Sequence, residues 1–182
     1  MFNKSEKIAV LIDGPFLSSV GNVLNVRIDF RSLRLAFAKR GRISTMKYYT
    51  YVDYHQEENS LFKLLDWLEY NGYRVFKKPC RTTIGNDGKR MFHGSVSAEL
   101  ATDMILLASK VDHIVFFGNS LDYIYPISEA KRLGVQITLA TTSEPSGFKI
   151  KDELRRVADH TLDISELQLE ADQSKQILIA AE

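Results

Sequence analysis

The sequence predicts an α/β domain with a parallel central sheet and helices on both faces. Residues 8–12 form an apolar run that ends in Asp13-Gly14, which is typical of a buried parallel strand. Strand-like and helical segments then alternate in the order β-α-β-α-β-α-β-α-β, which favours a parallel sheet. The clearest helical face is formed by Leu61, Leu64, Leu65 and Leu68.

Composition limits the class of protein. The chain has 182 residues, of which 45% are hydrophobic and 26% charged, as expected for one globular domain. We assign this domain to residues 1–165 and treat residues 166–182 as a tail. The net charge of +1 means that any basic surface must be local. One cysteine excludes an internal disulfide, and no apolar run approaches about 20 residues, so we expect a cytoplasmic protein without a membrane partner.

In the first half of the chain, the residue pattern predicts two helices and two further strands. Asp29 is suited to cap a helix that ends at Gly41. Residues 46–53 are rich in aromatic and β-branched side chains, which favour a strand. The leucine-rich helix covers residues 57–70, and a third strand covers residues 73–76.

The second half continues the alternation after a loop at residues 77–93. We expect a helix that begins near Gly94 and ends near Lys110, a strand at 113–117, a helix at 123–133, a strand at 135–140 and a short basic helix from Lys151. The tail is acidic and then apolar. A docking helix, an oligomer contact and a disordered end all stay open for it, as does a homo-oligomer.

Several carboxylates stand where a parallel sheet would place a functional site. Asp13 ends the first strand, Asp122 follows the fourth, and Asp103 lies in an otherwise apolar helix. Ligands of open α/β sheets bind beyond the carboxyl ends of the strands. Glu99 lies one turn from Asp103, so these acids repel each other unless a cation lies between them. The pattern suggests a metal site, while Asp13 could instead open a turn or cap a helix.

The segment from 77 to 93 is the one locally basic stretch near a strand end. It carries five cationic residues against a single acid, namely Lys77, Lys78, Arg81, Lys89 and Arg90. Two interpretations stay open for it: a loop that contacts backbone phosphates and an ordinary solvated surface loop.

Three segments together resemble the NYN domains, the LabA-like branch of the PIN-like nuclease superfamily. These segments are Leu11-Ile-Asp13-Gly, Gly94-Ser-Val-Ser-Ala-Glu-Leu-Ala-Thr-Asp103 and Gly118-Asn-Ser-Leu-Asp122-Tyr, and Ala158-Asp159 follows them. The resemblance extends over about residues 7 to 165. It implies a three-layer α/β/α PIN-like (Rossmann-like) fold whose central, mainly parallel sheet has about five or six strands.

The resemblance also implies a set of site residues. Asp13, Asp103 and Asp122 match the family's acids, so they would be catalytic and would hold Mg²⁺ or Mn²⁺. Further candidate ligands are Glu99, Asn119 and Ser120. Hard divalent ions prefer oxygen ligands, and Mg²⁺ often takes only one or two carboxylates besides water and phosphate.

Four departures from the family pattern weaken this ligand set. Phe16 stands where the family has Asn, His93 where it has a basic residue, and Ser97 where it has an acid. The segment 118–122 has one residue more than the family spacing, so either Asn119 or Ser120 replaces the first Asp of that motif. Each lost charge weakens the binding of an ion and its help in activating water.

Two functions from different classes follow. The first is a metal-dependent nuclease that acts on RNA, with single-stranded RNA favoured. Its substrate contacts would come from Lys77, Lys78, Arg81, Lys89, Arg90, His93 and Ser97. The second is a catalytically degenerate NYN domain that binds RNA or another protein. The retained acids favour the nuclease, and the four departures keep the binding module open.

Overall fold

The computed structural model describes residues 3–53, 60–85, 90–142, 150–164 and 178–180. A six-stranded sheet forms its centre, in the order β4-β3-β1-β7-β8-β9, and every pairing within it is parallel. The strands are β1 (Lys7–Asp13), β3 (Arg42–Val52), β4 (Arg74–Pro79), β7 (His113–Phe117), β8 (Gln136–Thr141) and β9 (His160–Asp163). This sheet confirms the predicted α/β fold.

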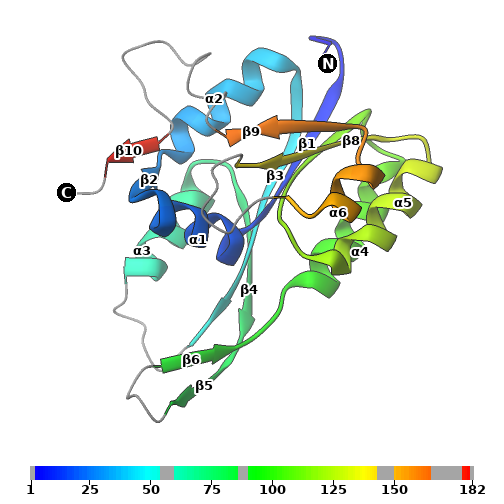
Figure 1. The fold of residues 1–182 in the computed structure, drawn as a ribbon. Coiled ribbons are helices and arrows are strands. Elements are labelled where there is room, and N and C mark those ends of the chain that lie inside the picture. Colours follow the sequence, from blue (N-terminus) through cyan, green and yellow to red (C-terminus); the bar gives the residue numbers. More distant parts are fainter. Residues whose placement is uncertain (1–2, 54–59, 86–89, 143–149, 165–177, 181–182) are drawn as a thin grey trace.

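Helices cover both faces of the sheet, as predicted (Figure 1). On one face lie α1 (Gly14–Leu24), α2 (Phe30–Arg40) and α3 (Ser60–Tyr70). On the other lie α4 (Ser97–Ala108), α5 (Ile124–Arg132) and α6 (Asp152–Val157). Each face has its own apolar cluster, and side chains of β1 alternate between the two clusters because successive residues of a strand point to opposite faces.

The order of the strands determines where a ligand site can lie. The chain builds the sheet outward from β1, first through β3 to β4 and later from β7 through β8 to β9. The direction of building therefore reverses between β1 and β7. In open α/β sheets, the crevice at such a switch point, beyond the carboxyl ends of the strands, is the usual ligand site.

Helix α1 is the main element that the sequence analysis missed. It begins directly after β1, with Pro15 in its first turn and Asp13 as its N-cap, and both are favoured at a helix start. Leu17 and Val20 are buried at helical spacing. The intervening serines and glycine resemble a loop, which masked this short pattern. The short strand β2 (Val26–Ile28) after α1 was also not predicted.

The prediction of a loop at residues 77–93 is wrong for most of this segment, because strands occupy it. Strand β4 continues to Pro79, and β5 (Arg81–Ile84) pairs antiparallel with β6 (Arg90–His93). The β-branched run Thr82-Thr83-Ile84 supplies the strand propensity that the charges obscured. This two-stranded ribbon extends from the lower end of the sheet in Figure 1.

Part of the tail also has a described conformation. Residues Leu178–Ala180 form β10, which pairs antiparallel with β2, while residues 165–177 lie outside the described part of the chain. Among the described residues, no helix combines the length and apolarity needed to span a bilayer.

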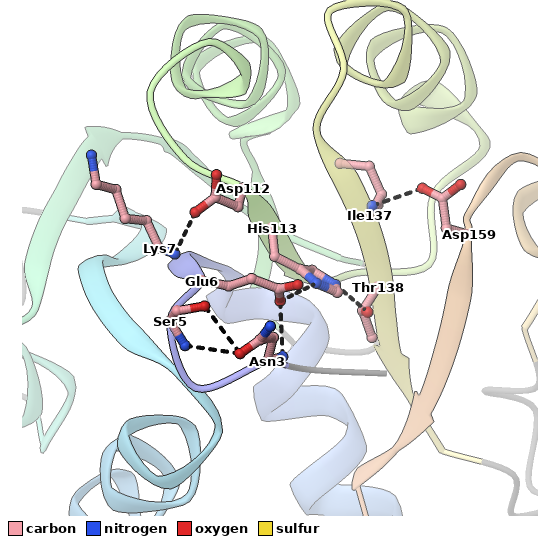
Figure 2. A network of polar contacts seen from close by, with 9 residues as sticks. All are labelled: Asn3, Ser5, Glu6, Lys7, Asp112, His113, Ile137, Thr138 and Asp159. Atoms are coloured by element: carbon pink, nitrogen blue, oxygen red, sulfur yellow. Dashed lines mark hydrogen bonds and ion pairs between the residues drawn. The ribbon is translucent and has the colours of Figure 1, made fainter.

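A polar network occupies the opposite, N-terminal edge of the sheet (Figure 2). The fully buried His113 lies with its Nε2 2.6 Å from Thr138 Oγ1 and its Nδ1 3.6 Å from Glu6 Oε2. Burial lowers the pKa of His113, the nearby charge of Glu6 opposes this shift, and the stacked His160 reinforces it. Asp159, which accepts a hydrogen bond from the backbone of Ile137, also opposes the shift.

His113 should make the stability of the fold depend on pH. Its pKa is lowered in the folded state, so below about pH 6.5 the unfolded chain binds a proton that the folded chain does not. The free energy of unfolding should therefore fall as the pH drops below that value. Over the same drop in pH, the free energy of unfolding of His113→Gln should fall less than that of wild type. Urea unfolding at pH 7.5 and 5.5 measures this. Equal losses in both proteins would contradict the assignment.

Candidate functional site

Asp13 lies at the switch point and serves two roles. Its Oδ1 accepts a hydrogen bond from the backbone N–H of Phe16 at 3.1 Å, so it caps α1, and its Oδ2 accepts one from the hydroxyl of Tyr123 at 3.0 Å. Burial raises the pKa of Asp13, and the two hydrogen bonds oppose that shift. The capping alternative from the sequence is therefore observed, and it does not remove Asp13 from the site.

Asp103 projects from α4 onto two side chains of β3. Its Oδ2 accepts a hydrogen bond from the Tyr49 hydroxyl at 2.6 Å and lies 2.8 Å from Lys47 Nζ. Lys47 and Tyr49 are two residues apart in a strand, so they share the face that α4 covers. Tyr49 is also the register partner of Asp13 on the neighbouring strand. Asp103 thus carries an internal counter-ion.

Glu99, one turn earlier on α4, has a separate lysine. Its Oε1 lies 2.7 Å from Lys78 Nζ, and this contact lowers the pKa of Glu99. The sequence predicts that Glu99 and Asp103 need a cation between them. In the structure each acid instead contacts its own ammonium group, one from β4 and one from β3.

The segment after β7 orders Asp122 through its own neighbour. Ser120 Oγ accepts a hydrogen bond from the Asp122 backbone N–H at 3.3 Å and donates one to Asp122 Oδ2 at 3.0 Å. Ser120 thereby caps the short 3₁₀ helix η2 (Leu121–Tyr123). The neighbouring Asn119 turns its Oδ1 toward the backbone N–H of Lys151 at 3.4 Å.

Tyr123 and Tyr49 are site residues that the sequence analysis missed. Tyr123 is fully buried, donates to Asp13, and also has a side-chain hydrogen bond with Ser97, the residue at the position of a family acid. Burial is the main reason that the pKa values of both tyrosines are raised, so both hydroxyls stay protonated as donors. The alternation in β3 could have placed Lys47 and Tyr49 on one face. Their partner on α4 had no local signal.

The acids, as they lie, do not form a ligand set for Mg²⁺ or Mn²⁺. A hard divalent ion needs several carboxylate oxygens turned toward one point. Here Asp103 and Glu99 contact lysines, Asp13 caps a helix and Asp122 bonds to Ser120. Within the described residues, no three His, Cys, Asp or Glu side chains are grouped closely enough to hold a metal ion. The metal and catalytic roles of these acids stay predictions.

The predicted substrate-binding cations differ in their surroundings. Lys77 lies 3.1 Å from Glu69 and 3.8 Å from Asp66, and Lys78 contacts Glu99. Arg81 and His93 are exposed on the ribbon, where they face each other across its two strands. Arg90 belongs to β6, and Lys89 lies outside the described residues. Among the described side chains of this set, Arg81 and His93 of the ribbon are therefore more exposed than Lys77 and Lys78 at the end of β4.

Fold and site together define an α/β domain with a carboxylate-bearing switch point, the architecture expected of the PIN-like superfamily. The family model of the NYN domain matches residues 7–167, so the chain belongs to the NYN domain family. No curated protein matches the sequence.

Comparison with solved structures supports the fold. A protein of unknown function from Vibrio parahaemolyticus is similar with a TM-score of 0.70 at 16% identity, over 92% of this chain and 98% of that one. A putative UDP-N-acetylglucosamine 2-epimerase from Listeria monocytogenes reaches only 0.44 at 10% identity, over 88% of this chain and 40% of that one.

The ion pair between Lys47 and Asp103 should couple the two residues energetically. Both side chains are mostly buried, at 17% and 29% exposure, so the effects of Lys47→Met and Asp103→Asn on unfolding should not add. We expect a coupling of about 0.5–3 kcal/mol from a double-mutant cycle in urea. The exposed pair of Arg155 and Asp152 is the control, with about 0.5 kcal/mol or less expected. Additive effects at Lys47 and Asp103 would contradict the ion pair.

Proposed function

We propose that this chain is an NYN domain that binds single-stranded RNA without cleaving it. The observation that carries the proposal is the contact of Lys47 Nζ with Asp103 Oδ2 at 2.8 Å. A lysine ammonium group thus already contacts the carboxylate that the family resemblance assigns to a divalent ion. Because like charges repel, the lysine and the ion compete for the same oxygen atoms.

The four departures from the family pattern support the same conclusion. Phe16, Ser97 and Ser120 stand at or beside positions where the family has oxygen-rich or acidic ligands. In this chain Ser97 bonds to Tyr123, and Ser120 to Asp122. The former ligand positions therefore stabilise the protein's own loops. The nuclease, which the retained acids favour in the sequence, becomes the alternative that experiment must test.

Neutralised acids also suit a surface that contacts RNA. A cluster of four free carboxylates would repel backbone phosphates unless a metal ion bridged them. Lys47 and Lys78 offset two of these charges from within the domain. The ribbon then offers Arg81 and His93 on one exposed face, together with Thr83 and Met91. We assign phosphate contacts to this face of the ribbon.

The distinction between binder and enzyme can be tested with Mn²⁺. We expect wild type to bind single-stranded RNA, to leave it intact with Mn²⁺ present, and to show no rise in melting temperature with the ion. A variant that combines Phe16→Asn, Ser97→Asp and Ser120→Asp with Lys47→Met should gain an Mn²⁺-dependent rise, because it restores the ligand acids and removes the competing ammonium group, and an ion that binds only the folded state stabilises it.

Cleavage by wild type would favour the nuclease if it is lost in the matched variants. Asp13→Asn and Asp103→Asn each keep the shape of the side chain and remove one charge. A loss of about two orders of magnitude or more in both variants would overturn our proposal. Cleavage that persists undiminished in both would indicate a contaminating nuclease.

The salt dependence of RNA binding should identify the cations that contact phosphate. Arg81→Gln should weaken binding similarly for all sequences and reduce the slope of log K against log salt by about 0.7, because one fewer counterion is released from single-stranded RNA. Lys77→Gln is the control, since Lys77 is already paired with Glu69, and its effect should be smaller. Binding that is unchanged in Arg81→Gln would exclude the ribbon as a phosphate contact.

A further inference from the structure

A cavity of about 670 Å³ lies among α1, β2, β3 and the start of α3. Its wall includes Gly14 and Pro15, so it begins directly after Asp13. It lies toward the helices of the first half of the chain, whereas Glu99 and Asp103 project from α4 on the other face. Its volume falls within the range of about 300 to 1,000 Å³ that is usual for small-molecule sites. Neither the predicted metal site nor the ribbon accounts for this cavity.

The wall of the cavity is suited to a flat, aromatic ligand. Four aromatic residues line it: Phe30 and Tyr48 are buried at its base, and Tyr51 and Phe62 are the half-buried rings on which a ligand can stack. Gly14 allows helix α1 to approach β3 closely here, because a Cβ at this position would lie 2.6 Å from Tyr48 Cζ and 2.7 Å from the Tyr49 carbonyl oxygen. The close approach is therefore set by the backbone, and a larger residue at 14 could not preserve it.

Two charged residues stand among the side chains that line the cavity. Arg27 comes from β2 and is exposed, and Asp53 follows the end of β3. A guanidinium only donates hydrogen bonds, and a carboxylate only accepts them. The cavity therefore offers donors and acceptors from different strands around an aromatic interior. This combination selects for a ligand that presents both kinds of polar edge.

Guanine is the RNA base that matches this arrangement best. Its O6 and N7 atoms accept hydrogen bonds from an arginine, and its N1–H and N2–H₂ groups donate side by side to a carboxylate. Adenine has a single donor group on this edge, its N6 amino group, beside the acceptor N1, and the neutral pyrimidines also lack a pair of adjacent donors. Unpaired bases bind proteins by stacking on aromatic side chains, which the cavity also supplies.

A hydrogen bond links the cavity to the ribbon. Thr82 Oγ1 of β5 donates to Asp53 Oδ2 at 2.7 Å, so the ribbon and the carboxylate hold one another in place. A carboxylate has acceptor sites for several hydrogen bonds at once, so Asp53 can bind Thr82 and a base edge together. An RNA strand whose phosphates lie on the ribbon would thus pass close to the mouth of the cavity.

The geometry points to this cavity as a binding pocket for one unpaired guanine, with Arg27 and Asp53 reading its edges. The inference rests on the proposed RNA binding for the source of the base. A free guanine nucleotide shares the same chemistry, so the experiment must separate the two sources. In either case the pocket adds base selectivity, which phosphate contacts alone do not give.

The test compares short oligouridines with and without one central guanosine, and guanosine monophosphate with adenosine monophosphate. Fluorescence anisotropy measures the oligomers, and calorimetry the mononucleotides. We expect the guanosine oligomer to bind about tenfold or more tightly than oligouridine, as for a good bidentate base contact. Asp53→Asn and Arg27→Gln should each remove most of this preference.

A second pair of variants distinguishes a lost binding site from a loss of folding. Ser18 lines the cavity and is exposed, so Ser18→Trp should fill the mouth of the pocket without disturbing the core. Ser128→Trp places the same side chain on an exposed position of α5 and should keep the guanosine preference. If Ser18→Trp keeps the preference while its thermal unfolding matches wild type, the pocket assignment is wrong.

The outcomes separate this inference from the proposed function. RNA binding with no preference for guanosine would overturn the pocket and leave the RNA-binding proposal intact. Selective binding of guanosine monophosphate without any oligomer binding would support the pocket as a free-nucleotide site and overturn the RNA-binding proposal. Absence of both kinds of binding would overturn both.

Discussion

The complete burial of β1 is the constraint on which the rest of the structure depends. Residues 8–12 have no exposed surface, because β3 and β7 pair with both edges and helices cover both faces. A strand enclosed in this way has one permitted register, since a slip of one residue would exchange its two apolar faces. The register in turn fixes Asp13 beside Tyr49 and at the start of α1. The candidate site is therefore a consequence of how the core packs.

Much of the fold was predictable because its strongest signals are local. The apolar run of β1 and the leucine spacing of α3 each reflect burial of one short segment. Helix α1 escaped prediction because its apolar face is interrupted by serines and glycine, and its cap, Asp13, also ends a strand. The ribbon was not predicted for a different reason. The charges of residues 77–93 suggested a solvent-exposed loop, but an exposed two-stranded ribbon carries such charges as readily as a loop does.

The sequence identified the acids of the candidate site, whereas their contact partners could not be predicted from it. Asp13, Asp103 and Asp122 stand out through motif and position, which a sequence displays directly. Lys47 and Lys78 belong to different strands, and each meets its acid on α4 only because β3 and β4 are adjacent in the sheet. Such a contact leaves no periodic trace in the chain. The charge balance of the site was therefore invisible until the tertiary arrangement was known, although that balance decides whether a divalent ion fits.

Under the proposed function, the same charge balance would explain how a nuclease scaffold could become a binding surface with few substitutions. Removing ligand acids alone would leave the remaining carboxylates repelling each other and any phosphate nearby, because no ion would offset them. Lysines fixed beside the acids reduce the repulsion among the carboxylates and the repulsion of phosphate. An ion pair in a partly buried site is held by the fold, so this effect does not depend on the metal concentration. Lysines in place of a metal ion would also lower the rate of hydrolysis, because an ammonium group cannot activate a water molecule as a metal ion does. Under the proposed function, the ribbon would supply the attraction for RNA, and the acids would serve to stabilise the fold. The retained Asp13 fits this view well, because it caps α1 and bonds to Tyr123 whether or not any reaction occurs.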